Sequence, residues 1–145
     1  MKRTLATIGY EQATQAAVID KLRAAGVEVL IDVRAVAASR RAGFSKTILA
    51  NSLAEHGIDY VHLRALGTPK AGREAARHGR IDEMHMIYAQ QLELPEAQLQ
   101  LAQAAEIAGA RKAALLCFEA DHARCHREII AKRLAAAHGF SIENL

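Results

Sequence analysis

The chain has 145 residues and a hydrophobic content of 51 %, which suits one domain over residues 1–145. It contains no apolar run of membrane-spanning length and no apolar core of a signal peptide, so we expect a cytoplasmic protein with no membrane partner. A net charge of +3 favours an anionic partner, and two cysteines are too few for a disulfide framework, so we expect them to be free thiols or ligands.

Apolar strands alternate with amphipathic helices along the chain. Strands are expected over residues 4–9, 27–33, 58–63, 113–119 and 140–145. Helices are expected over residues 13–25, 46–55, 81–92, 95–108 and 125–137. Gly26 and Gly57 would end the first two helices, and Ser45 would cap the second at its start. Residues 64–79 show no period and are expected to be irregular.

Strands that alternate with helices indicate parallel βαβ units joined by right-handed crossovers. We therefore predict a three-layer α/β/α sandwich with a mainly parallel sheet of about four to five strands. In such sheets, ligands bind beyond the carboxyl ends of the strands. The irregular, charge-rich segments all follow strands, so the predicted functional surface combines residues 32–46, 66–73 and 119–127.

Basic residues gather in two of these segments, where acidic residues are scarce. The first group is Arg34, Arg40, Arg41 and Lys46, and the second is Lys70, Arg73, Arg77 and Arg80. Such clusters favour an anionic small molecule or a nucleic acid as the partner, although solvated basic loops have the same composition.

The sequence Cys125-His126-Arg127 opens a predicted helix just after a strand. A helix N-terminus attracts anions and stabilises a thiolate, so Cys125 is a candidate nucleophile, and His126 and Arg127 are candidate ligand-binding residues. A helix cap whose thiol packs inward would give the same pattern. The phosphatase loop is excluded because the position six residues after the cysteine is Ala131 rather than arginine.

Carboxylates stand at the ends of two predicted strands. Glu119 is a candidate general acid or base, a candidate ligand to a substrate hydroxyl, or the ion-pair partner of Arg127 or Arg34. Asp32 and Arg34 point to one face of their strand and are candidate ligand-binding residues, although an isolated pair of this kind also acts as a salt bridge that holds the following loop.

The loop after Arg34 combines cations, hydroxyls and one aromatic ring. Its candidate ligand-binding residues are Ser39, Arg40, Phe44 and Lys46, which suit a phosphate with a stacked ring. On composition alone, a solvated basic loop is the favoured interpretation of these residues. His62 is the scattered histidine that we place nearest the site, on the same strand face as Tyr60.

Four potential metal ligands lie close together in the sequence, namely Cys117, His122, Cys125 and His126. Their spacing matches no standard zinc pattern, and Cys117 belongs to the middle of a strand. We assign no metal and name no cofactor. Glycine-rich dinucleotide, P-loop and serine-hydrolase motifs are also missing.

Five motifs in order give the chain a specific resemblance. They are Thr7-Ile8-Gly9-Tyr10-Glu11, Asp32-Val33-Arg34 with Ser39-Arg40 and Gly43-Phe44-Ser45-Lys46, Gly57-Ile58 with Tyr60 and His62, Leu66-Gly67-Thr68-Pro69-Lys70, and Cys117-Phe118-Glu119 with Cys125-His126-Arg127. Together they resemble the DUF488 family of uncharacterised bacterial and archaeal proteins. The resemblance implies a prokaryotic protein with one α/β domain and marks the candidate residues above as motif positions. It implies no reaction, although a nucleic-acid-related role has been suggested for such proteins.

The sequence departs from the family pattern at four positions. Ala37 and Ala42 stand where prolines are common, so the first loop is expected to be looser. Gln12 replaces a usual glycine, and Asn144 stands where the last strand often has histidine.

Two functions from different classes follow. The first is an enzyme acting on a phosphate- or carboxylate-bearing substrate such as a nucleotide, with Arg34, Arg40, Lys46 and Arg127 on the anion. The second is a non-enzymatic module that binds nucleic acid or protein. The Asp32-Val33-Arg34 strand end also resembles rhodanese-like domains, but the loop before Cys125 is built differently.

Overall fold

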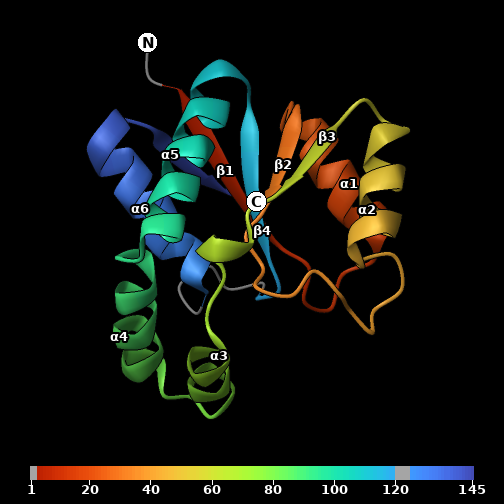
Figure 1. The fold of residues 1–145 in the computed structure, drawn as a ribbon. Helices are drawn as coiled ribbons and strands as arrows, with labels where there is room; N and C mark the ends of the chain where they lie inside the picture. The colour runs from red at the N-terminus through yellow and green to blue at the C-terminus, as the bar shows by residue number, and fades with distance from the viewer. Residues whose placement is uncertain (1–2, 120–124) are drawn as a thin grey trace.

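The computed structural model describes residues 3–119 and 125–145 (Figure 1). Its centre is a five-stranded sheet in the order β3-β2-β4-β1-β5, and every pair of neighbouring strands is parallel. The strands are β1 (Thr4–Gly9), β2 (Val29–Asp32), β3 (Asp59–His62), β4 (Ala113–Cys117) and β5 (Ser141–Asn144). The predicted α/β sandwich and parallel sheet are confirmed.

Helices cover both faces of the sheet (Figure 1). The helices are α1 (Gln15–Ala24), α2 (Lys46–Ala54), α3 (Lys70–Arg77), α4 (Ile81–Leu92), α5 (Pro95–Ala110) and α6 (His126–His138), with a 3-10 turn η1 (Arg64–Leu66). On one face, α1 and α2 pack on side chains such as Leu30 and Leu116. On the other, α5 and α6 pack on their neighbours in the strands, such as Ile31 and Leu115. Successive residues of a strand therefore contribute to two separate cores, which requires near-continuous apolar strands.

The strand order reverses between β1 and β4. The chain runs from β1 outward to β2 and β3, returns to β4 between β1 and β2, and ends at β5 on the far side of β1. The connections after β1 and β4 thus leave in opposite directions, which opens a crevice beyond the carboxyl ends of these strands. This is the edge at which the sequence places the candidate functional residues.

The expectation that residues 64–79 are irregular is wrong, because they contain η1 and α3. Helix α3 buries only Gly72 and Ala75, so the sequence shows no apolar stripe of helical period. Pro69 directly precedes the helix, a position that tolerates its missing N–H. Helices α3 and α4 pack against each other below the carboxyl end of the sheet (Figure 1).

Other boundaries agree closely with expectation, and one cap works differently. Gly26 and Gly57 follow α1 and α2 in the left-handed conformation that ends a helix (φ 72° for both). Ser45 precedes α2 but makes no cap hydrogen bond. Its hydroxyl instead accepts from the Ser39 amide at 3.1 Å and donates to the Ser39 carbonyl at 3.3 Å, which ties the loop after β2 to itself.

Among the described residues, the helices are all too short or too polar to cross a membrane.

Candidate functional site

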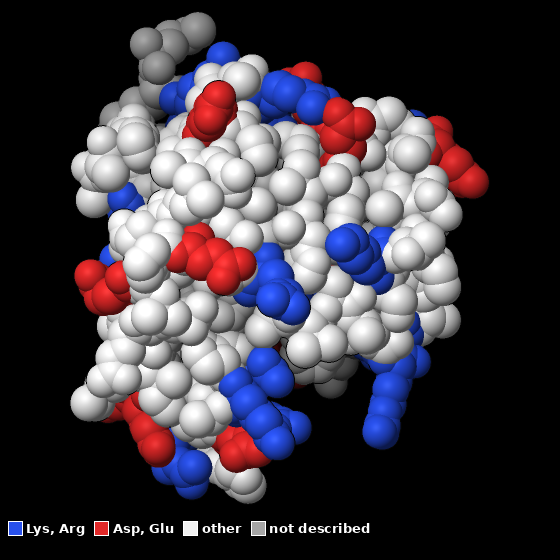
Figure 2. Space-filling model, viewed as in Figure 1, with Lys and Arg blue, Asp and Glu red and all other residues white. Residues whose placement is uncertain are grey.

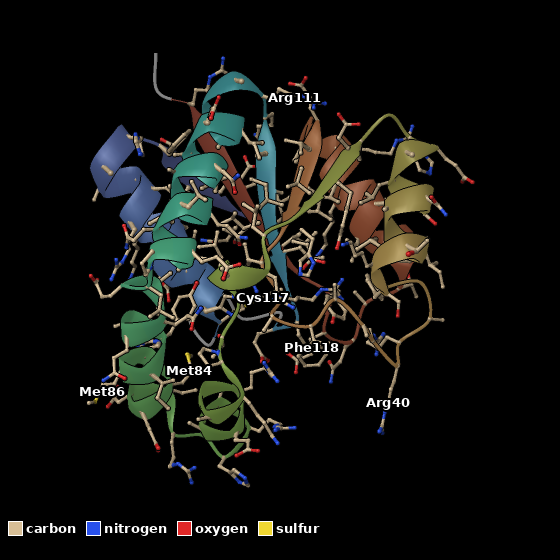
Figure 3. All side chains as sticks on the ribbon, in the orientation of Figure 1. Arg40, Met84, Met86, Arg111, Cys117 and Phe118 are labelled. Atoms are coloured by element: carbon tan, nitrogen blue, oxygen red, sulfur yellow. A yellow bond between two sulfur atoms is a disulfide. The ribbon has the colours of Figure 1, made fainter. Side chains whose placement is uncertain are left out.

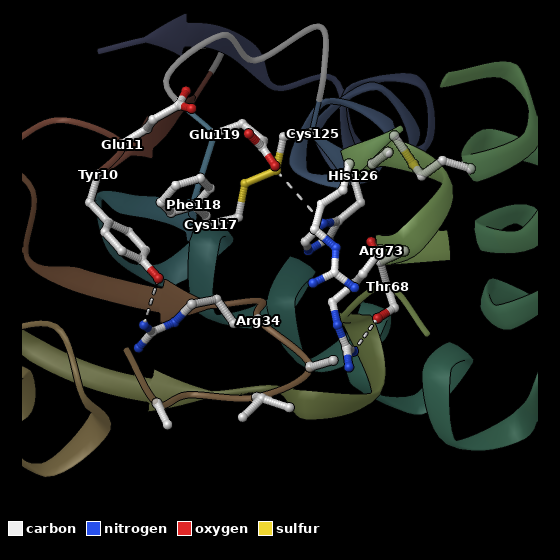
Figure 4. Close-up of a pocket in the computed structure, with 16 residues that line it drawn as sticks. Tyr10, Glu11, Arg34, Thr68, Arg73, Cys117, Phe118, Glu119, Cys125 and His126 are labelled. Atoms are coloured by element: carbon white, nitrogen blue, oxygen red, sulfur yellow. Dashed lines mark hydrogen bonds between the residues drawn. A yellow bond between two sulfur atoms is a disulfide. The ribbon is translucent and has the colours of Figure 1, made fainter. Parts of the chain in front are cut away.

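A pocket of about 660 Å³ opens where the loops after β1, β2 and β4 meet α3 (Figure 4). Tyr10 and Glu11 follow β1, the segment from Arg34 to Ala38 follows β2, and Phe118 and Glu119 follow β4. Gly67 lets its segment pack directly against the loop after β2, since a Cβ on this residue would lie 2.1 Å from the Ala35 backbone nitrogen. The pocket therefore lies at the predicted edge of the sheet.

Asp32 and Arg34 form a buried ion pair at the end of β2. The Asp32 side chain is 0 % exposed and that of Arg34 is 6 % exposed. Asp32 Oδ1 accepts from the Arg34 amide at 3.0 Å and from Arg34 Nε at 2.9 Å, and Oδ2 accepts from Arg34 Nη2 at 2.7 Å. Arg34 Nη1 donates to the Phe44 carbonyl at 2.8 Å and to the Tyr10 hydroxyl at 3.2 Å. The Arg34 guanidinium therefore uses most of its hydrogen-bond donors on groups within the protein.

Neighbouring strands extend this network. The Tyr60 hydroxyl of β3 donates to Asp32 Oδ2, and His62 Nε2 lies 2.7 Å from the Arg34 carbonyl oxygen. Burial first, and then the hydrogen bond to Asp32, raises the pKa of Tyr60. Burial lowers the pKa of Arg34, but its hydrogen bonds to Asp32 and the charge of Asp32 raise it above its usual value. Tyr60 therefore stays neutral and Arg34 stays charged.

Cys117 and Cys125 form a disulfide, so the expectation of free thiols is wrong. Cys117 is the last residue of β4 and Cys125 directly precedes α6, which packs on β4. The end of a strand and the start of the helix that follows it thus bring two cysteines together. The number of cysteines and the expected cytoplasmic location, on which the prediction of free thiols rested, carry no information about this contact. Both cysteines line the pocket (Figure 4).

The His126 ring has its two nitrogens in different settings. Nε2 lies 2.6 Å from the Val33 carbonyl oxygen, which can only accept, so Nε2 carries the hydrogen. Nδ1 then has a lone pair and lies 3.7 Å from Cys125 Sγ. Burial lowers the pKa of His126 to about 4, against a raising effect of the Val33 hydrogen bond, and the nearby Arg127 charge lowers it further. His126 is therefore neutral at pH 7.

Arg127 is buried beside the disulfide. Its side chain is 1 % exposed, and Nη1 donates to Cys117 Sγ at 3.1 Å and to the Glu119 carbonyl oxygen. The positive charge is thus held beside one sulfur of the pair.

Comparison with known proteins identifies the family. A family model described as "Domain of unknown function DUF488" matches residues 14–134. The chain belongs to the DUF488 family. A search of curated proteins returned no match, and neither did a search of solved structures.

The structure brings together only part of the predicted site of this DUF488 protein. Four of the predicted residues line the pocket, namely Arg34, Glu119, Cys125 and His126. Asp32 and Arg127 lie buried beneath it. Phe44 is 0 % exposed and stacks on Tyr10 with the ring centroids 4.4 Å apart, so it belongs to the core.

The remaining three predicted residues lie in the loop after β2 or at the start of α2, outside the pocket lining. Ser39 is half-buried and its hydroxyl accepts from the Arg41 amide at 3.1 Å. Arg40 and Lys46 are exposed, and Figure 3 shows Arg40 projecting into solvent, far from Cys117. The structure therefore does not gather Arg34, Lys46 and Cys125 around one anion.

The predicted site did not include two basic residues that line the pocket, although the sequence places both in a basic group. Arg73 and Arg77 lie four residues apart on α3, and both line the pocket. Arg73 Nη1 donates to the Thr68 carbonyl at 2.9 Å. Among residues 3–119 and 125–145, no carboxylate forms an ion pair with either arginine. The spacing of four residues between the two arginines would have placed them on one helix face, but the sequence pattern did not predict α3. Figure 2 shows basic side chains gathered over this lower part of the molecule.

One cluster could offer metal ligands in another redox state. The sulfurs of Cys117 and Cys125 and a ring nitrogen of His126 lie within 4.8 Å of one another. The two sulfurs are bonded to each other, so they would become donors only after reduction. His122, which the sequence considers with them, lies outside the described residues.

Proposed function

We propose that this DUF488 protein binds a small phosphate- or carboxylate-bearing molecule in the pocket at the carboxyl ends of β1, β2 and β4. The observation that carries the proposal is a pocket of about 660 Å³ with two arginines of α3 on its wall. Pockets of about 300–1,000 Å³ are typical of small-molecule sites. The volume favours a small ligand such as a nucleotide component over a duplex nucleic acid.

The charges facing the pocket support an anion at Arg73 and Arg77. Arg73 uses Nη1 for the Thr68 carbonyl and keeps other N–H donors, and the fork geometry of a guanidinium suits phosphate and carboxylate oxygens. Arg34 is a poorer candidate because Asp32, Tyr10 and Phe44 occupy its donors. Glu11 and Glu119 also line the pocket, so an anion would lie on the α3 side.

Glu119 and Cys125 are the candidate catalytic residues of the same pocket. Glu119 is half-buried just after β4 and would act as general acid or base. Cys125 would act as a nucleophile only after reduction of its disulfide, with the N-terminus of α6 favouring its thiolate. In an enzyme of this kind, the Cys125 thiolate would bond to an acyl or phosphoryl group of the bound anion while the leaving group departs with a proton from Glu119. Water would then release the group from the sulfur and restore the thiolate.

Thermal unfolding with inorganic phosphate, pyrophosphate and AMP tests the binding. A ligand that binds only the folded state raises the midpoint temperature with concentration, and we expect this at constant ionic strength. Arg73→Ala with Arg77→Ala should abolish the rise. Arg23→Ala, which removes an exposed charge from the last turn of α1 outside the pocket lining, should retain it.

The outcomes separate the two function classes. A rise that is equal in the wild type and the double variant would contradict the assignment of the arginines, and no rise with any of the three probes would contradict the small-anion pocket. Binding to single-stranded RNA or DNA that weakens steeply with salt, and that Arg40→Ala with Lys46→Ala reduces, would instead favour a nucleic-acid-binding module.

A further inference from the structure

The disulfide between Cys117 and Cys125 lies in the wall of the pocket, within reach of a bound small molecule. We propose that this disulfide is redox-active and exchanges with low-molecular-weight thiols that carry a carboxylate or phosphate group. This inference rests on the proposed function, because the same pocket has to bind the anionic part of the thiol.

The surroundings of Cys117 suit a leaving thiolate. Arg127 Nη1 donates to Cys117 Sγ at 3.1 Å, and the guanidinium is buried, so its charge is only weakly screened by solvent. A cation hydrogen-bonded to a sulfur stabilises the negative charge that develops on this sulfur when it leaves in disulfide exchange. Attack on the disulfide should therefore occur at the other sulfur, that of Cys125.

The surroundings of Cys125 suit a sulfur that is attacked and later released. Cys125 is the N-cap residue of α6, where the helix N-terminus stabilises negative charge. His126 Nδ1 lies 3.7 Å from Cys125 Sγ with its lone pair available, because Nε2–H is held by the Val33 carbonyl. In the reduced protein this nitrogen can accept a hydrogen bond from the Cys125 thiol, which keeps the sulfur oriented toward the pocket.

The exchange balances in two steps. A substrate thiolate attacks Cys125 Sγ, its sulfur forms a new S–S bond there, and the old S–S bond breaks with its electron pair passing to Cys117 Sγ. A second thiolate then attacks the substrate sulfur of this mixed disulfide and releases Cys125. Two substrate thiols are oxidised to one disulfide, the protein disulfide is reduced to two thiols, and the protons pass from the substrate thiols to the protein thiols through solvent. A small-molecule disulfide drives the reverse reaction.

The arginines of α3 supply the selection for charged thiols. Arg73 and Arg77 line the pocket together with both cysteines, so a short molecule can place its sulfur at Cys125 while its anionic group contacts a guanidinium. The remote anionic group would then raise the effective concentration of the sulfur at the disulfide. A neutral thiol of equal size lacks this contact.

The test compares reduction by 3-mercaptopropionate with reduction by 3-mercaptopropionamide, which has the same length and no charge. Samples of the folded protein are quenched with iodoacetamide, and the alkylated cysteines are counted by mass spectrometry. At equal thiolate concentration we expect the carboxylate to react about fivefold faster, the advantage of one partly exposed charge contact. Arg73→Ala with Arg77→Ala should remove the preference, and Arg23→Ala should keep it.

A second measurement examines which sulfur is attacked. In Cys117→Ser, incubation with the disulfide of 3-mercaptopropionate should leave a stable mixed disulfide on Cys125. In Cys125→Ser, Cys117 should be modified more slowly, because its sulfur is held by the Arg127 hydrogen bond and is the more buried of the two cysteines. Modification of Cys117 at the same rate as Cys125 would contradict the assigned roles.

The outcomes also separate this inference from the proposed function. A disulfide that is reduced only in urea would overturn the redox proposal, and equal rates with both thiols would overturn the selection for anions. Either result combined with stabilisation by phosphate would leave the anion pocket standing. Selective reduction without any stabilisation by phosphate, pyrophosphate or AMP would contradict the proposed function and support the redox role of the disulfide.

Discussion

Replacement of Asp32 by asparagine should destabilise the protein strongly, because it leaves the buried Arg34 without a counter-charge. Asp32 is fully buried and accepts hydrogen bonds from the amide, Nε and Nη2 of Arg34 and from the Tyr60 hydroxyl. Asparagine keeps one acceptor oxygen and turns an amide donor toward groups that also donate. Removal of one partner from a buried ion pair costs about 3–5 kcal/mol.

Urea unfolding followed by circular dichroism measures this loss. A domain of this size has a total free energy of unfolding of about 5–15 kcal/mol, so Asp32→Asn should lower the urea midpoint by about 2 M. Asp59→Asn is the matched control, because Asp59 lies on the neighbouring strand with its side chain 67 % exposed and pairs with Arg111 at 2.6 Å. An exposed pair of this kind contributes about 0–1 kcal/mol.

A double-mutant cycle separates the ion pair from other effects at the site. Because Arg34→Met and Asp32→Asn each leave one buried partner unpaired, the double variant should lose at least about 1 kcal/mol less than the sum of the single losses. Equal losses in Asp32→Asn and Asp59→Asn, or strictly additive single losses, would refute the view that Arg34 serves the structure rather than the ligand.

Three further predictions concern single residues. Burial lowers the pKa of His126 to about 4, whereas it is about 6.5 in an unfolded chain, so the unfolded state binds more protons between these two pH values. The free energy of unfolding should therefore fall by about 3 kcal/mol as the pH drops from 6.5 to 4. If urea titrations of His126→Gln show the same dependence of stability on pH as the wild type, this prediction is contradicted. Gly67→Ala should lower the free energy of unfolding by more than about 2 kcal/mol in calorimetry, because the added Cβ would meet the Ala35 backbone. Gly109→Ala on α5, where the space is open, should raise it by about 0.5 kcal/mol. Similar changes for both variants would argue against close packing at Gly67. Gln12 has φ 57°, so Gln12→Gly should raise the free energy of unfolding by about 0.5–1 kcal/mol, and a lower midpoint temperature would show that this backbone is not strained.

Much of the fold follows from local patterns that need no tertiary information. The short β-branched apolar run at β2 predicts a strand buried on both faces, and its alternation with helical segments indicates parallel strands. The placement of Cys125 at a helix start and of Glu119 after a strand followed from the same patterns. Helix α3 was not predicted from the sequence because its short buried face consists of Gly72 and Ala75, which give no apolar periodicity.

The arrangement within the site depended on contacts between residues far apart in the chain. The sequence determined that Asp32, Arg34 and Cys125 lie at one edge of the sheet, because the carboxyl ends of parallel strands share an edge. Only the tertiary structure decided that Phe44 packs in the core and that Cys117 forms a disulfide with Cys125. It also decided that the guanidinium of Arg34 is occupied by its ion pair with Asp32. Periodicity fixes which way a side chain leaves its own strand or helix, but its partners depend on how elements distant in sequence pack together.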